Sequence, residues 1–226
     1  MGILYVVGTP IGNLEDISRR ALQTLRRVDL IATENPAHTQ KLLARYDIGT
    51  PMTRYTDAYE RKKRERLQMV LAALERGDVA LVSEAGMPGL SDPGYELLQT
   101  AVERGVSIVT LPGPTAVTAA LSVSGFPVER YVFVGFLPRR EKARRNLLKS
   151  VRHVPYPVVA YESPHRLLNT LRDIQAMLGE RELSVSGELT KLYEQTRRGT
   201  ANELLLHFQA HPPRGEFVLI IGGQDR

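Results

Sequence analysis

The feature that most constrains this chain is the regular alternation of short apolar runs with amphipathic segments along its whole length. Apolar runs of about four to eight residues are typical of buried strands, and apolar residues spaced three and four apart are typical of helices. Strands that alternate with helices form parallel sheets with helices packed on them. The sequence therefore predicts an α/β protein. The expected strands are Ile3–Val7, Val28–Thr33, Val79–Ser83, Val106–Leu111, Tyr131–Val134, Val158–Tyr161, Leu183–Ser186 and Phe217–Ile221; the expected helices are Ile17–Arg26, His38–Tyr46, Ala58–Arg76, Tyr95–Arg104, Ala116–Ser124, Glu141–Val151, His165–Leu178 and Asn202–Gln209.

The length of 226 residues allows one large domain or two small ones, at about 100 to 200 residues per domain. Pro and Gly residues interrupt the pattern between positions 112 and 127, so we place a domain boundary near residue 115. This predicts an N-terminal α/β domain over 1–115 with a mostly parallel sheet and a C-terminal α/β domain over 116–226. Because the segment from Leu183 to Gly199 lacks helical periodicity and proline, we expect the C-terminal sheet to be mixed, with antiparallel strands.

Several function classes are excluded by what the sequence lacks. Without cysteine there are no disulfides, thiolate metal ligands or cysteine nucleophiles. Neither a G-x-G-x-x-G fingerprint nor a P-loop occurs, which argues against dinucleotide binding and nucleotide hydrolysis. Only His207 and His211 have a spacing that suits a metal, and Pro212 should end their helix, so no metal site is expected. With no long apolar run and no charged leader at its start, the chain is expected to be cytoplasmic, away from membranes.

The basic residues gather in two clusters, and the formal net charge is +5. Charge runs are usually solvated helix faces, but two basic clusters on a positive chain also suit a polyanion such as RNA. Phosphate contacts from these side chains would position RNA rather than read its bases. The candidate RNA contacts are Arg61, Lys62, Lys63, Arg64, Arg139, Arg140, Arg144 and Arg145.

Four loops rich in glycine and proline each follow an expected strand. Glycine permits positive φ and close approach of a ligand to the backbone, whereas proline stiffens a loop. Ordinary helix starts explain part of the pattern, since Asp92-Pro93 and Ser163-Pro164 are good cap pairs. Ligands of α/β sheets nevertheless bind beyond the carboxyl ends of the strands, so four such loops favour a shared ligand site. The loops span residues 8–14, 83–94, 111–116 and 161–166.

In these loops the chain resembles the ribosomal small-subunit RNA methyltransferase I family, a branch of the tetrapyrrole methylase superfamily of S-adenosylmethionine enzymes. The resemblance rests on strings such as Thr9-Pro10-Ile11-Gly12-Asn13-Leu14, Pro88-Gly89-Leu90-Ser91-Asp92-Pro93-Gly94 and Glu162-Ser163-Pro164-His165-Arg166. It implies a two-domain homodimer that binds S-adenosylmethionine between the domains. The implied reaction is 2′-O-methylation of a cytidine ribose in the decoding region of small-subunit ribosomal RNA, either free or in the assembled subunit. A methyltransferase acting on a tetrapyrrole or similar small molecule, and a non-catalytic relative that binds RNA or cofactor, remain alternatives.

The resemblance also implies roles for individual residues. A ribose hydroxyl is a poor nucleophile, so a general base or a stabilising cation would assist the transfer. The candidates for that role are Glu34, Glu162, Glu188 and Lys191, while Arg166 is expected to contact RNA or to be structural. The residues expected to bind the cofactor are Gly86, Met87, Pro88, Gly89, Ser91, Asp92, Pro112, Gly113, Thr115, Ala116, Tyr161, Glu162, Ser163, Leu189 and Thr190.

The chain departs from the family pattern at three places. Glu34-Asn35-Pro36-Ala37 stands where the family has Glu-Asp-Thr-Arg, so an acid and an arginine are lost together. Glu84 and Met87 replace an aspartate and a threonine, and the segment from Tyr55 to Glu60 replaces a string that contains histidine. The first departure predicts weaker substrate binding at that position, compensated by the basic clusters, or a different or reduced substrate.

Overall fold

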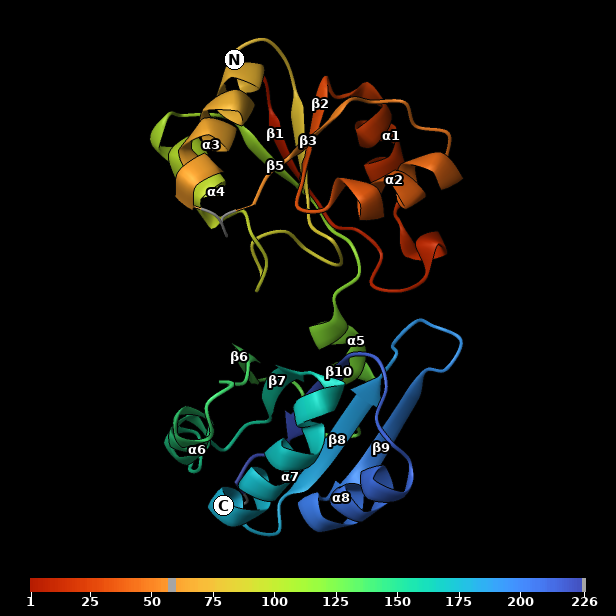
Figure 1. Ribbon diagram of the computed structural model, residues 1–226, viewed down its shortest axis with the longest axis vertical. Helices are drawn as coiled ribbons and strands as arrows, with labels where there is room; N and C mark the ends of the chain where they lie inside the picture. Colours follow the sequence, from red (N-terminus) through yellow and green to blue (C-terminus); the bar gives the residue numbers. More distant parts are fainter. Residues whose placement is uncertain (57–59, 225–226) are drawn as a thin grey trace. The chain divides into compact units, whose positions relative to one another are not determined.

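The computed structural model describes residues 1–56 and 60–224, without the side chains of residues 60 and 61. The chain divides into two compact units, Met1–Thr115 and Ala116–Arg226, and each unit contains one five-stranded sheet flanked by helices (Figure 1). The first sheet is parallel and the second is mixed, which confirms the predicted α/β fold class.

The first unit is a parallel sheet between two pairs of helices (Figure 1). The strand order is β3-β2-β4-β1-β5, so the first strand of the chain lies inside the sheet. Because helices cover both faces, the inner strands read as continuous apolar runs. The elements are β1 (Leu4–Val7), a 3-10 turn η1 (Leu14–Asp16), α1 (Arg19–Arg27), β2 (Leu30–Thr33), α2 (Pro36–Arg45), β3 (Met52–Arg54), α3 (Glu60–Leu74), β4 (Val79–Val82), α4 (Tyr95–Glu103) and β5 (Ile108–Leu111).

Two apolar clusters lie on opposite faces of this sheet. Leu25 of α1 packs with Val7 and Ile31 on one face, where α2 also contributes. Leu74 of α3 packs with Leu4 on the other face, together with α4. Alternate residues of β1 therefore serve both cores, and all five strands end at the same edge of the sheet.

The second unit has helices α6, α7 and α8 packed against one face of its sheet (Figure 1). The order is β6-β7-β10-β8-β9; β6 is parallel to β7, and the remaining neighbours are antiparallel. Its core joins Leu148, Leu171 and Phe208 of the three helices to Leu219 of the central strand. The elements are α5 (Ala116–Ser122), β6 (Val132–Phe136), α6 (Glu141–Ser150), β7 (Val158–Glu162), α7 (Pro164–Leu178), β8 (Glu182–Gly187), β9 (Gln195–Thr200), α8 (Ala201–Ala210) and β10 (Phe217–Ile221).

Most expected elements are present, with ends that move by a few residues. The strand expected from Val28 begins at Leu30, because Val28 ends α1 and donates its backbone N–H to the Thr24 carbonyl at 3.0 Å. The strand expected from Val106 begins at Ile108. The prediction missed β3 and η1, and it gave no bounds for β9. The start expected for the third helix, Ala58, lies outside the described residues.

Candidate functional site

Three of the four predicted loops meet at the carboxyl edge of the first sheet. Thr9 and Gly86 exchange backbone hydrogen bonds of 2.9 and 3.1 Å, which join the loop after β1 to the loop after β4. The backbone N–H of Gly8 donates to the Leu111 carbonyl at 3.0 Å, which holds the end of β5 beside them. The loops following β1, β4 and β5 therefore form one cluster inside the first unit. The fourth loop, 161–166, belongs to the second unit.

Glycine is required where two of these loops touch. A Cβ atom on Gly8 would lie 2.7 Å from the backbone of Gly113, and one on Gly113 would lie 2.8 Å from the backbone of Gly8. The Met87 sulfur would also lie 2.7 Å from a Gly8 Cβ, so this half-buried side chain covers the contact. Real Cβ atoms do not approach other atoms so closely, and the main chains pack directly against each other here.

The loop after β4 has an unusual backbone. Gly86 and Gly89 both have φ of +81°, and Ser91 has φ of +64° although it is not a glycine. A side chain in the left-handed region costs about 1–2 kcal/mol, so Ser91 is held there by its surroundings. The Ser83 hydroxyl also donates to the carbonyl of Gly86 at 3.2 Å. Strained, main-chain-lined loops of this kind are common at ligand sites.

The expected cofactor residues fall into two groups. Gly86 to Asp92 and Pro112 to Thr115 belong to the loop cluster of the first unit. Ala116 starts α5 in the second unit, which also contains Tyr161–Ser163 and the pair Leu189 and Thr190. The cofactor role of both groups stays a prediction.

The departures from the family pattern have clear local structures. The Asn35 side chain accepts the backbone N–H of His38 at 3.2 Å, and Pro36 occupies the first turn, so the pair forms an ordinary capped start of α2. Ala37 is exposed. A carboxylate oxygen of Glu84 lies 3.5 Å from Nδ1 of His38, which links the loop after β4 to α2.

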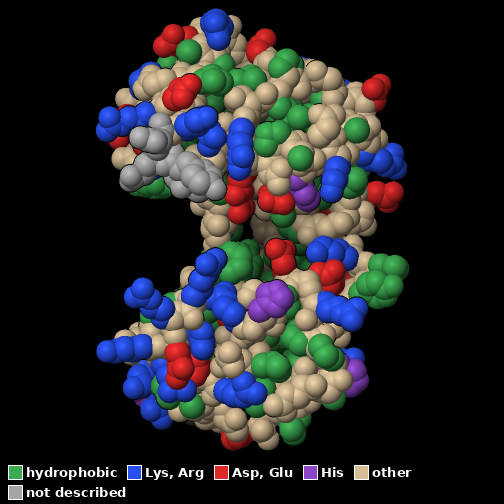
Figure 2. All heavy atoms as spheres, viewed as in Figure 1, with side chains coloured by type: hydrophobic (Ala, Val, Ile, Leu, Met, Phe, Trp, Pro, Cys, Tyr) green, Lys and Arg blue, Asp and Glu red, His purple; other side chains and the backbone are tan. Residues whose placement is uncertain are grey.

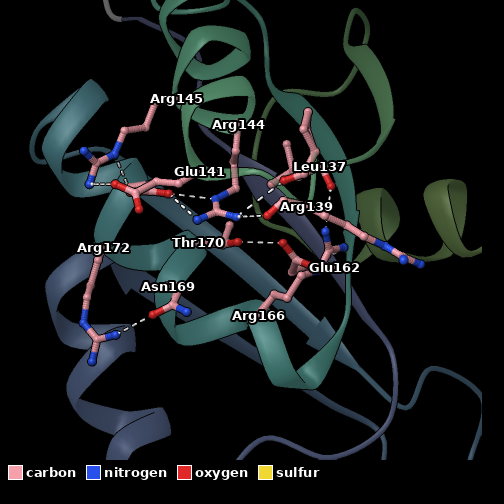
Figure 3. Close-up of polar contacts among 12 residues, drawn as sticks. Leu137, Arg139, Glu141, Arg144, Arg145, Glu162, Arg166, Asn169, Thr170 and Arg172 are labelled. Carbon is pink, nitrogen blue, oxygen red and sulfur yellow. Dashed lines mark hydrogen bonds and ion pairs between the residues drawn. The ribbon is translucent and has the colours of Figure 1, made fainter.

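Glu162 is a buried carboxylate whose two oxygens are both bonded within the second unit (Figure 3). One oxygen accepts the Ser163 backbone N–H at 2.7 Å and contacts Nη2 of Arg166 at 2.6 Å; the other accepts the Thr170 hydroxyl at 2.6 Å. Arg166 in turn donates to the Leu137 carbonyl at 2.9 Å. These bonds engage both oxygens of Glu162, which argues against a role as general base and favours a structural role for Glu162 and Arg166.

The remaining base candidates lie in different units. Glu34 follows β2 in the first unit and is half-buried. Glu188 follows β8 in the second unit with φ of +53°, and its carboxylate pairs with Lys191 Nζ at 2.9 Å. Thr190 also has positive φ, at +66°, and its buried hydroxyl makes no hydrogen bond within the described part of the chain.

One predicted RNA contact is wrong. Arg144 is only 5 % exposed, and its guanidinium pairs with the buried carboxylate of Asp173 through Nε at 2.7 Å and Nη2 at 2.5 Å (Figure 3). Arg145 contacts the other Asp173 oxygen at 2.7 Å and a carboxylate oxygen of Glu141 at 2.8 Å. Its positive charge is therefore already paired with two carboxylates of the same unit. Burial and this pairing make Arg144 unavailable to phosphate. The Asp173 interaction raises the pKa of Arg145, which stays charged.

The other basic positions of this cluster reach the surface. Figure 2 shows Lys and Arg side chains gathered on the second unit where α6 lies. Five of them form no ion pair within the described ranges. They are Arg139, Arg140, Lys142, Lys149 and Arg152, all exposed.

The basic cluster on α3 is divided. Lys62 and Arg64 are exposed, whereas Lys63 pairs with Glu96 of α4 at 2.9 Å. The side chain of Arg61 lies outside the described residues.

Across residues 1–56 and 60–224, no group of three or more His, Asp or Glu side chains is arranged to hold a metal ion. In the same residues, no helix is long and apolar enough to cross a membrane.

A sequence profile described as Tetrapyrrole (Corrin/Porphyrin) Methylases matches residues 3–205. The chain therefore belongs to the tetrapyrrole methylase family. Solved structures support the fold: a cobalt precorrin-4 methyltransferase superposes with a TM-score of 0.71 at 17% identity over 97% of this chain and 94% of that one. A diphthine synthase gives 0.73 at 16% identity over 98% and 90%.

Within that family the chain groups with the proteins named ribosomal RNA small subunit methyltransferase I. The Thermotoga maritima protein of that name is 46% identical over 100% of both chains. The Synechocystis sp. protein is 48% identical over 99% of this chain and 80% of its own length. The Escherichia coli O157:H7 protein is 46% identical over 98% and 78%. These findings confirm the resemblance stated from the loops.

Proposed function

We propose that this protein transfers a methyl group from S-adenosylmethionine to the 2′-hydroxyl of a cytidine ribose in the decoding region of small-subunit ribosomal RNA. The observation that carries the proposal is the 46% identity, over the full length of both chains, to a protein named for methylation of this RNA. The loop cluster and the exposed cations of the second unit support it independently of that name.

The loop cluster of the first unit suits the cofactor through its backbone. Gly86, Gly89 and Ser91 turn the backbone through positive φ, Gly89 is exposed without a side chain, and the Gly8–Gly113 contact fixes the neighbouring loops. When bound, S-adenosylmethionine supplies an electrophilic methyl group. The chain then has to hold the acceptor oxygen in line and exclude water, and rigid loops are suited to this because a small misalignment is costly.

A base or cation is proposed to assist deprotonation of the ribose hydroxyl, contributing about 10²- to 10⁴-fold. Glu34 and the Glu188–Lys191 pair are the candidates that remain, because both oxygens of Glu162 are already bonded. Changing Glu34 to Gln and Glu188 to Gln separately distinguishes them: the base should lose turnover while S-adenosylmethionine affinity is retained.

The acceptor is identified by a direct transfer assay. The protein and S-adenosylmethionine with a labelled methyl group are incubated with small subunits that lack this methylation, with naked small-subunit RNA and with a tetrapyrrole acceptor. We expect label in RNA, at the 2′-oxygen of one cytidine after nuclease mapping. Label in the tetrapyrrole alone would establish the small-molecule alternative, and cofactor binding without transfer to any acceptor would establish a non-catalytic protein.

Cofactor binding is tested by calorimetry on a matched pair of variants. Gly86→Val places a branched side chain between Ile11 and Pro114, which already lie 3.6 and 3.7 Å from the Cβ position, and should abolish S-adenosylmethionine binding. Gly105→Val carries similar backbone strain, with φ of +67°, but has no atom within 4 Å and lies after α4. It should bind as the native chain does. Equal affinity of the two variants would remove the loop cluster from the proposal.

A further inference from the structure

An aromatic side chain is exposed at the end of the edge strand β6. Phe136 is 56% exposed although it is the last residue of a strand. The centroid of its ring lies 5.1 Å from the ring centroid of Tyr161 on β7. Tyr161 also contacts Phe133 edge-on at 5.1 Å. The Phe136 ring is therefore supported from one side and open on the other. An apolar ring held in this way can receive another flat ring.

Cations follow this ring directly in the sequence. Arg139 is three residues away, within about 11 Å at full extension, and Arg140 is next to it. Both are exposed, and neither forms an ion pair within the part of the chain that the structure describes. Figure 3 shows the Arg139 side chain extending away from the buried network. The nearest acid in the sequence, Glu141, is already paired with Arg145 at 2.8 Å. The surface thus favours a partner that is both flat and anionic.

The backbone that carries these arginines is held by two other arginines. Arg166 donates to the carbonyl of Leu137 at 2.9 Å, and Arg144 approaches the carbonyls of Pro138 and Arg139 at 3.4 Å each (Figure 3). The guanidinium groups are themselves fixed by Glu162 and Asp173. A loop fixed in this way loses little conformational entropy on binding, which favours affinity.

We propose that Phe136, Arg139 and Arg140 form a platform for an unpaired segment of RNA. The Phe136 ring stacks on one base, and the two guanidinium groups bind neighbouring phosphates, as single-strand-binding surfaces do. The proposal rests on the RNA substrate proposed above and assigns it a contact site. Stacking needs an exposed base face, so the platform prefers single-stranded to duplex RNA.

The chain contains no tryptophan, which makes the test direct. F136W introduces a single indole on the platform, and Y193W introduces one at the 77% exposed Tyr193 beyond β8 as a matched control. Each variant is titrated with a single-stranded oligoribonucleotide and with the same sequence as a duplex, while fluorescence anisotropy of labelled RNA follows binding. We expect quenching of the F136W protein by the single strand, weaker quenching by the duplex and none in the Y193W protein.

Affinity supplies a second readout. Stacking on an aromatic ring contributes about 1–3 kcal/mol per base, so Phe136→Ala should weaken single-strand binding about 5- to 150-fold. Phe136→Tyr should restore it. The dependence of affinity on salt should be unchanged by Phe136→Ala, because the ring carries no charge.

Three outcomes would overturn the platform. The first is RNA binding without quenching in the F136W protein, and the second is equal quenching in the Y193W protein. The third is a blue shift of the F136W emission as protein concentration rises without RNA, which would show that this surface is a contact between two copies of the chain. Methyl transfer to small subunits is measured for every variant. Transfer without quenching rejects the platform and leaves the proposed function standing, whereas quenching without transfer by the native chain rejects the function alone.

Discussion

Removing the Asp173 carboxylate should strongly destabilise the second unit. Asp173 is 2% exposed and is the charge partner of Arg144, which is 5% exposed. In Asp173→Ala, the Arg144 guanidinium keeps only its two long contacts, at 3.4 Å, with carbonyl oxygens. Breaking a buried ion pair on one side costs about 3–5 kcal/mol. For a domain of this size that lowers Tm by about 12–20 °C.

The assay is thermal unfolding followed by circular dichroism, with Arg145→Ala as the control. Arg145 contacts the same carboxylate, but its side chain is 42% exposed, so its loss should cost at most about 1 kcal/mol. Replacing both buried charges, in Arg144→Met with Asp173→Leu, should recover much of the loss because no unpaired charge is left inside. The reasoning is refuted if Asp173→Ala lowers Tm no more than Arg145→Ala.

Three further predictions test other parts of the molecule. Gly113→Ala should lower the free energy of unfolding of the first unit, measured in urea, by about 1–3 kcal/mol, because the new Cβ would lie 2.8 Å from the Gly8 backbone. As the control, Gly49→Ala should be nearly neutral, because no atom lies within 4 Å of its Cβ position. Replacing Arg139 and Arg140 together with Ala should reduce the slope of log affinity for single-stranded RNA against log salt by about 1.4, at about 0.7 per phosphate; an unchanged slope would remove both from the RNA surface. Burial lowers the pKa of His207 below its usual value of 6.5, so the His207 imidazole binds a proton less readily in the folded chain than in the unfolded chain. Stability should therefore be lost as pH falls below 6.5, and His207→Gln should lose less over the same range.

The sequence predicted the fold best where strands are buried. β10 has the expected bounds, Phe217–Ile221, because all five of its residues are buried and apolar. In contrast, β3 has three partly exposed residues after Pro51, and the six polar or glycine residues of β9 show no apolar alternation. β9 is an edge strand whose position is fixed by pairing with β8. Tertiary pairing of this kind leaves no local signal in the sequence.

The same limit applies to the site. The loops after β1, β4 and β5 could be found because glycine and proline mark unusual backbone locally. The partner of Arg144 is 29 residues away, so its pairing could not be inferred from the basic cluster. A signal for its burial was nevertheless present: Arg144 precedes Leu148 by four residues and Leu147 by three, which places it on the inward face of α6.

The capped start of α2 makes the family departures experimentally separable from folding. Aspartate caps a helix as well as asparagine does, and the exposed Ala37 can be replaced by arginine without repacking. The missing acid and the missing arginine can therefore be restored as Asn35→Asp and Ala37→Arg, one at a time or together, without changing the fold of α2. Any resulting gain or shift in acceptor preference would report on those two charges alone, and the chain can serve as its own background for measuring what its relatives gain from them.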